Sequence, residues 1–167
     1  TSFQIPNYLK EGDKIALIST ARKISFNELQ SAIECIKSWG LDLVLGEHLF
    51  NSHNQFSASD DERTKDLQSM LNNPEIKAIL CVRGGYGTVR IIDNIDFSQF
   101  QKNPKWLAGF SDITVLHSHI HKLNVATLHS TMPISFSNNT SESIKSLKDA
   151  LLGKHLKIEI EHHPLNR

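Results

Sequence analysis

A serine that follows a short apolar run has the setting in this chain best suited to nucleophilic chemistry. Ser111 lies two positions after Gly109, in the segment KWLAGFSDIT at 105–114. A hydroxyl becomes an effective nucleophile when a base removes its proton and N–H donors stabilise the resulting oxyanion. Between a strand and a helix, the N–H of Asp112 would point at that oxyanion. The pattern is similar to a nucleophile elbow, although no glycine stands two positions after the serine. The alternative is that Ser111 only caps a helix over 112–123.

A glycine-rich turn upstream is the second candidate for chemistry. The run RGGYG at 83–87 follows a predicted buried strand and enters a predicted helix, where backbone N–H groups can hold an anion. It is neither GxGxxG nor a lysine-containing P-loop, so nucleotide binding fits poorly. Gly85 is the candidate oxyanion donor beside Ser111, because a bare backbone approaches closely; the alternative is a turn that only needs positive φ. Arg83 would either meet a ligand carboxylate or form a structural ion pair.

Histidines are frequent enough to raise the question of a metal site. His117, His119 and His121 fall in one predicted helix, where only the first and third share a face. No carboxylate or cysteine completes a ligand set, so we predict a solvated helix face, no metal and no cofactor. His129 follows a predicted strand and belongs either to a pocket or to the core.

Composition narrows the classes of partner. The 167 residues suit one domain, and 18 Lys+Arg balance 18 Asp+Glu, so neither nucleic acid nor an anionic membrane is an expected partner. No apolar run approaches the length of a membrane span. Cys35 and Cys81 are expected to be small core residues. The N-terminal residues do not resemble a signal peptide, which makes the cytoplasm the expected location.

Strand and helix patterns alternate along the chain. Strands are predicted at 14–20, 41–45, 76–82, 106–109 and 125–128, and helices at 25–39, 60–72, 87–95, 112–123 and 140–151. The first helix has the capping box Ser25/Glu28 and ends at Gly40. Continuous apolar runs such as KIALIST indicate strands covered on both faces. The predicted fold is an α/β, doubly wound, mainly parallel sheet with helices on both faces, like flavodoxin or class I amidotransferases. Residues 157–160 alternate like a further strand.

Several motifs together resemble the LD-carboxypeptidase family of serine peptidases, which includes microcin-immunity hydrolases. They are Gly12-Asp13, Arg63, RGGYG at 83–87, and Asn103-Pro104-Lys105 followed by GFSDIT at 109–114. The resemblance implies that Ser111 is the catalytic nucleophile and that the backbones of Asp112 and Gly85 form the oxyanion hole. It also implies substrate contacts from four residues: Arg83, Gly84, Tyr86 and His129. The segment His129-Ser130-Thr131-Met132 departs from the family's His-Gly-Pro-Met.

The resemblance also predicts what lies outside this chain. Family members are about twice as long, and a second, C-terminal domain supplies the glutamate and histidine of their triad. Residues 1–155 would then be the N-terminal domain and 156–167 the start of a linker, and this chain alone would be inactive. The implied reaction releases a terminal D-amino acid from murein tetrapeptides through an acyl-enzyme on Ser111, in a cytoplasmic homodimer.

Three alternatives remain from the sequence. The first is a microcin-type hydrolase of peptide conjugates, which would share the same nucleophile. The second is a non-catalytic binding or dimerisation module of the same fold. The third is a flavodoxin-like cofactor binder, which the absence of a phosphate-binding loop after the first strand disfavours.

Overall fold

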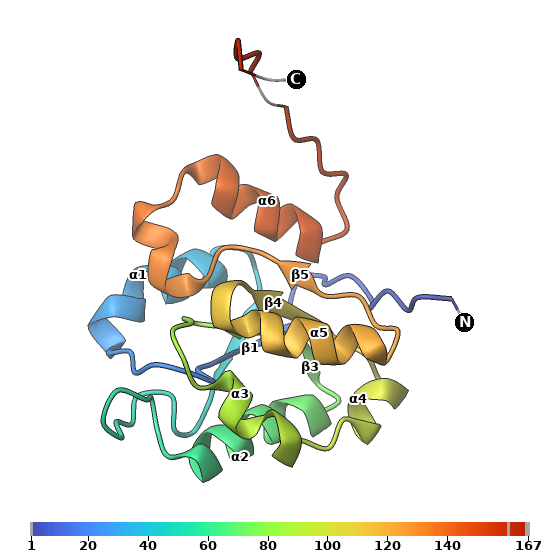
Figure 1. Cartoon of the computed structure of the whole chain (residues 1–167). Helices are drawn as coiled ribbons and strands as arrows, with labels where there is room; N and C mark the ends of the chain where they lie inside the picture. The colour runs from blue at the N-terminus through green and yellow to red at the C-terminus, as the bar shows by residue number, and fades with distance from the viewer. Residues whose placement is uncertain (1, 160, 166–167) are drawn as a thin grey trace.

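The computed structural model describes residues 2–159 and 161–165, and its centre is a parallel sheet of five strands (Figure 1). The order in the sheet is β2-β1-β3-β4-β5. The strands are β1 (Lys14–Ile18), β2 (Asp42–Leu45), β3 (Ile76–Cys81), β4 (Trp106–Gly109) and β5 (Leu128–His129). This order is that of flavodoxin-like sheets, in which ligands bind beyond the carboxyl ends of the strands.

Side chains of the central strands point alternately into two separate cores. In β1, Ile15 and Leu17 join one apolar cluster, whereas Ala16 and Ile18 join the other, and all four are fully buried. A strand that is covered on both faces needs apolar residues at every position, which is why its sequence is a continuous apolar run.

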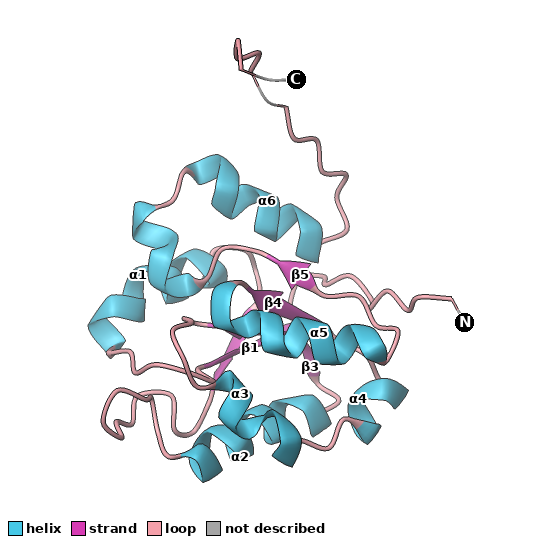
Figure 2. Cartoon of the chain, viewed as in Figure 1, coloured by secondary structure: helices cyan, strands magenta, loops and turns pink. Residues whose placement is uncertain are grey.

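Helices cover both faces of this sheet (Figure 2). The longer helices are α1 (Phe26–Lys37), α2 (Asp60–Asn72), α5 (Thr114–Lys122) and α6 (Ser141–Leu151), and the short ones are α3 (Thr88–Ile91) and α4 (Ser98–Lys102). Residues of α1 and α6 pack into the first core, and residues of α2, α3, α4 and α5 into the second. The predicted doubly wound α/β fold is therefore confirmed.

Helix starts follow the side-chain chemistry of the sequence. The Ser25 hydroxyl accepts a hydrogen bond from the backbone N–H of Glu28, and the Glu28 carboxylate accepts one from Ser25 N, which confirms the predicted capping box. Ser59 and Glu62 form the same box at the start of α2. These caps satisfy N–H groups that the first helical turn leaves without partners.

The structure also departs from the predicted elements. Strands β1, β2 and β3 are shorter than predicted, β5 is a two-residue strand, and the helix after Ser111 begins as a 3₁₀ turn over Ser111–Ile113. Helix α4 and a 3₁₀ helix over Pro133–Asn138 were not predicted. The strand predicted at 157–160 is wrong for 157–159, which pair with no strand, and residue 160 lies outside the described residues. No helix in residues 2–159 or 161–165 has the length and apolarity that crossing a membrane would require.

Candidate active site

Ser111 lies in a strained turn at the carboxyl end of β4. Its φ is +62°, in the left-handed region that serine rarely adopts, and its side chain is exposed. Such a conformation costs about 1–3 kcal/mol and tends to occur at functional sites. A serine held on a sharp turn between a strand and a helix is the geometry of a nucleophile elbow.

Gly109 makes this tight turn sterically feasible. A Cβ at position 109 would lie only 3.0 Å from Ile113 Cγ1, which is tighter than most real Cβ contacts, and the φ of +155° is one that L side chains rarely adopt. The glycine therefore lets the chain double back so that Ile113 packs beneath the end of β4.

The structure does not support the alternative that Ser111 is a helix cap. The 3₁₀ turn that begins at Ser111 and the helix α5 that follows it both lack a capping hydrogen bond from a side chain. Within the described residues, no hydrogen bond involves the Ser111 hydroxyl, so its Oγ is available to a ligand.

The glycine-rich turn and the Ser111 turn lie against each other. A Cβ added at Gly84 would lie 3.4 Å from Ser111 Cβ and 3.5 Å from the backbone nitrogen of Asp112. The Asp112 carboxylate accepts a hydrogen bond of 3.0 Å from the backbone N–H of Thr88, the first residue of α3. The side chain of Asp112 thus joins the two turns whose meeting the sequence had suggested.

Backbone donors are available at this junction. In the described part of the chain, the N–H groups of Gly85 and Asp112 donate no hydrogen bond to another residue. Gly85 lies under the stem of Arg22, because a Cβ at position 85 would lie 2.6 Å from Arg22 Cγ and Cδ. The glycine in contact with Ser111 itself is Gly84. The oxyanion roles predicted for Gly85 and Asp112 remain predictions.

Arg83 and Tyr86 contact neighbouring loops. The Arg83 guanidinium donates to the carbonyl of Lys23 at 2.8 Å, so it ties the glycine-rich turn to the loop after β1. Among the described residues, Arg83 forms none of the ion pairs that the sequence analysis had considered for it. The exposed ring of Tyr86 lies 6.3 Å, between centroids, from Phe56 in the loop before α2. Both side chains remain near the site, and their contacts with substrate remain predictions.

His117 does not lie on a solvated helix face as predicted; it is buried and supports the end of β4. Its Nε2 is 2.9 Å from the Gly109 carbonyl, and its Nδ1 is 2.7 Å from the Thr127 hydroxyl. Since a carbonyl only accepts, Nε2 donates to Gly109, and in the neutral ring Nδ1 accepts from the Thr127 hydroxyl. Burial lowers the pKa of His117, in agreement with that neutral form. His121 Nε2, 2.9 Å from the same hydroxyl, then donates to it.

His129 is exposed, which excludes the alternative of a core histidine. Its ring lies 6.2 Å, between centroids, from the ring of Phe110, the residue before Ser111. Both residues line a pocket of about 460 Å³ beside the elbow. The remaining lining comes from β5, the segment after it, α6 and the C-terminal segment, and comprises Leu128, Ser130, Thr131, Ser135, Asn139, Ser143, Ser146, Leu147, Ala150, Leu156 and Ile158.

The described residues provide no metal centre, and Cys81 is a buried core thiol. No group of three or more histidine, cysteine, aspartate or glutamate side chains in 2–159 and 161–165 is arranged to bind a metal ion. Burial raises the pKa of Cys81 to about 12, so this thiol stays protonated, as a core cysteine does. Cys35 is half-buried and packs against the first core.

Sequence reasoning missed three contributions to the site. The carboxylate of Asp112 and the imidazole of His117 act on backbone atoms of other segments, which residue spacing does not reveal. Arg63 was noted only as a family motif, yet it is buried in α2. A signal was present for Arg63, because it lies four positions before Leu67 on the apolar face of that helix.

Comparisons with known proteins agree on one family. Residues 15–130 match the sequence model described as the LD-carboxypeptidase N-terminal domain. A probable murein peptide carboxypeptidase of Bacillus subtilis is 41% identical over 128 residues, which are 76% of this chain and 40% of that protein. A murein tetrapeptide carboxypeptidase of Pseudomonas aeruginosa is 28% identical over 160 residues, which are 89% of this chain and 52% of that protein.

Solved structures agree with the sequence comparison. The crystal structure of an MccF-like protein from Bacillus anthracis superposes with a TM-score of 0.80 and 25% identity, covering 89% of this chain and 47% of that one. The chain thus spans about half the length of the proteins that it matches.

Proposed function

Because the chain belongs to the LD-carboxypeptidase family of serine peptidases, we propose that it is the nucleophile-bearing domain of a murein peptide carboxypeptidase. The observation that carries this proposal is the left-handed Ser111, exposed beyond β4 and packed against the glycine-rich turn. A helix cap would need neither the strain nor this contact, whereas a nucleophile needs to project its Oγ from a fixed backbone.

The proposed reaction cleaves the bond before a terminal D-amino acid of a murein tetrapeptide. The Ser111 Oγ attacks the carbonyl carbon of that bond, and the carbonyl oxygen becomes an oxyanion. The N–H groups of Asp112 and Gly85, which bond to no other described residue, donate to this oxyanion. The terminal D-amino acid leaves, and water hydrolyses the acyl ester on Ser111.

The base that activates Ser111 is proposed to come from a second domain. Of the histidines near the elbow, His117 is engaged by Gly109 and Thr127, and His129 lies in the pocket wall beyond Phe110. We assign neither of them the role of base. Residues 1–155 then form the nucleophile domain, residues 156–167 begin the linker, and the chain alone is inactive.

A chimera tests the assignment. The 167-residue chain, fused before the C-terminal half of the Bacillus subtilis relative, should release the terminal D-amino acid from a murein tetrapeptide, detected with a D-amino-acid oxidase. Ser111→Ala should lower kcat by at least about a thousandfold. Ser118→Ala, which removes an exposed serine of α5, is the matched control and should have no effect. Retained activity in Ser111→Ala would refute the nucleophile, and equal turnover by the unfused chain would refute the need for a second domain.

A microcin-type hydrolase of peptide conjugates is the second candidate. The likeness to an MccF-like protein favours this second candidate, because that protein has the same fold over 89% of this chain. Offering the chimera a peptide conjugate and a murein tetrapeptide side by side separates the two substrate classes. Family resemblance also leads us to propose a cytoplasmic homodimer, which sedimentation and cell fractionation would test.

A further inference from the structure

A buried charge lies behind the glycine-rich turn. Arg63, in the second turn of α2, is only 1% exposed. Such burial is unfavourable by a large free energy unless the charged guanidinium finds partners in place of water. Asp60, one helical turn earlier, forms an ion pair with it and supplies a counter-charge. This pair accounts for the charge of Arg63 but leaves most of its N–H donors to be satisfied elsewhere.

The remaining donors of Arg63 reach the backbones of three separate loops. Its Nη1 donates to the carbonyl of Thr20 and, at 3.1 Å, to that of Gly87, while its Nε donates to Ala58 at 3.3 Å. These carbonyls belong to the loop after β1, the glycine-rich turn after β3 and the loop before α2. A guanidinium has five donors in a rigid plane, so one side chain can fix all three loops relative to one another.

Gly87 shows how closely the turn is fitted to this side chain. A Cβ at position 87 would lie 2.8 Å from Arg63 Nη1 and 3.0 Å from Ala21 Cα, and the residue has a φ of +149°. Only glycine therefore lets the turn approach the guanidinium. The next residue, Thr88, donates its N–H to the carboxylate of Asp112, which neighbours Ser111. Arg63 is thus connected to the elbow by consecutive contacts.

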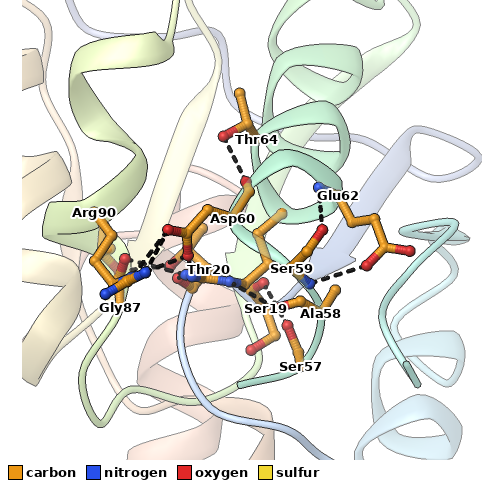
Figure 3. Close-up of polar contacts among 12 residues, drawn as sticks. Ser19, Thr20, Ser57, Ala58, Ser59, Asp60, Glu62, Thr64, Gly87 and Arg90 are labelled. Carbon is orange, nitrogen blue, oxygen red and sulfur yellow. Dashed lines mark hydrogen bonds and ion pairs between the residues drawn. The ribbon is translucent and has the colours of Figure 1, made fainter. Parts of the chain in front are cut away.

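Arg90 provides an internal comparison. Its exposed guanidinium binds the same Asp60 carboxylate, with Nη2 at 2.7 Å and Nε at 3.0 Å from Oδ2, and Figure 3 shows this pair beside Gly87 and Thr20. Within the described residues, no loop carbonyl accepts a hydrogen bond from the Arg90 side chain. Removing the charge of Arg90 therefore removes its pair with Asp60 and its contact with the Phe56 ring, but it breaks no hydrogen bond to a loop carbonyl.

We propose that Arg63 is a positioning residue, whose guanidinium sets the glycine-rich turn against the Ser111 elbow by holding the carbonyls of Gly87, Thr20 and Ala58. The proposal rests on the proposed function for its catalytic meaning, because the turn matters as an oxyanion donor only if Ser111 is the nucleophile. The geometric part concerns the turn alone, and it can be measured without any activity.

Amide exchange in the 167-residue chain, followed by NMR, tests the geometric part. The Thr88 amide reports the contact between turn and elbow, and the Leu80 amide in β3 reports the whole sheet. Arg63→Lys retains the charge but has no planar fork, so it should accelerate exchange of Thr88 at least tenfold relative to Leu80. Arg90→Gln, the matched control, should leave that ratio within about twofold. Equal acceleration of Thr88 and Leu80 in Arg63→Lys, or an equal effect of Arg90→Gln, would overturn the proposal.

A measurement on the unaltered chain keeps the proposal testable if Arg63→Lys does not fold. The Hη protons of Arg63 should give separate, slowly exchanging resonances, because carbonyls fix them, whereas those of the exposed Arg90 should be averaged by rotation. Averaged Hη resonances for Arg63 would overturn the proposal.

Kinetics of the chimera then test the catalytic meaning. Arg63→Lys should lower kcat at least tenfold with KM changed less than threefold. Loss of the Thr88 contact together with unchanged kcat would refute the catalytic role of the turn, while the nucleophile assignment would still depend on Ser111→Ala alone.

Discussion

Glycine at position 111 should give a more stable protein than alanine at the same position, although glycine usually destabilises. The comparison is between Ser111→Gly and Ser111→Ala, since both remove the hydroxyl and differ only in the Cβ. At a φ of +62°, alanine keeps the left-handed strain and glycine relieves it.

The size of the effect is the balance of two terms. The left-handed conformation costs an L-residue about 1–2 kcal/mol, which glycine recovers in the folded state. Glycine also makes the unfolded chain freer, which costs about 0.4–1 kcal/mol. With the middle of each range, the glycine variant should therefore be more stable than the alanine variant by about 0.8 kcal/mol.

Ser118, exposed within α5, supplies the matched control. In the interior of a helix, glycine is about 1 kcal/mol less stable than alanine. Urea denaturation of all four variants gives two glycine-minus-alanine differences, which should have opposite signs and differ by about 1.5–2 kcal/mol. For a domain of this size, each kcal/mol corresponds to about 2–4 °C in Tm.

A destabilising glycine at both positions would refute the reasoning. It would mean that residue 111 adopts an ordinary right-handed conformation in solution, and the elbow would lose its structural basis.

Three further predictions concern stability. Asp112→Ala, which removes the acceptor of the Thr88 N–H, should lower the free energy of unfolding by about 1–2 kcal/mol, and Asp112→Asn should recover part of it, as urea denaturation would show. Burial lowers the pKa of Lys105 to about 8, so between pH 8 and 10.5 the unfolded chain holds the Lys105 proton more than the folded chain does. The stability of the wild type relative to Lys105→Met, taken from urea midpoints, should therefore rise with pH over this range by up to about 3 kcal/mol. The comparison with Lys105→Met is needed because Cys81, whose pKa is raised by burial, changes stability in the opposite direction above pH 9. The hydrogen bond that His48 Nδ1 donates to the Asp66 carboxylate raises the pKa of His48, so its stabilisation should be complete below pH 6.5 and be lost as the pH rises through the folded pKa. Asp66→Asn should flatten the difference in Tm between pH 6 and 8.

Local signals in the sequence were sufficient for the main elements of the fold. The Ser25/Glu28 capping box and the continuous apolar run of β3 are readable because each depends on neighbouring residues only. Helix α4 was missed because only Phe100 of its five residues is buried, which leaves no periodic pattern. Alternation over 157–159 did not give a strand, since alternating side chains need a neighbouring strand with which to pair.

The candidate site was predictable in its backbone and not in its supporting side chains. Gly109 and Ser111 are adjacent to a readable strand end, so the elbow could be placed from the sequence. His117 and Arg63 act through carbonyls of distant segments, which only the folded sheet brings near them. A histidine on a helix and a charged residue on an apolar helix face are therefore ambiguous until the fold is known.

The placement of β3 between β1 and β4 also bears on the order in which the chain folds. Parallel pairing of β1 with β3 must close over α1, β2 and α2, and such non-local pairing forms slowly. Arg63 can reach Thr20 and Gly87 together only after that pairing, so the elbow should acquire its strained backbone after the rate-limiting barrier. Relief of the strain in Ser111→Gly should consequently slow unfolding and leave the refolding rate unchanged in stopped-flow measurements.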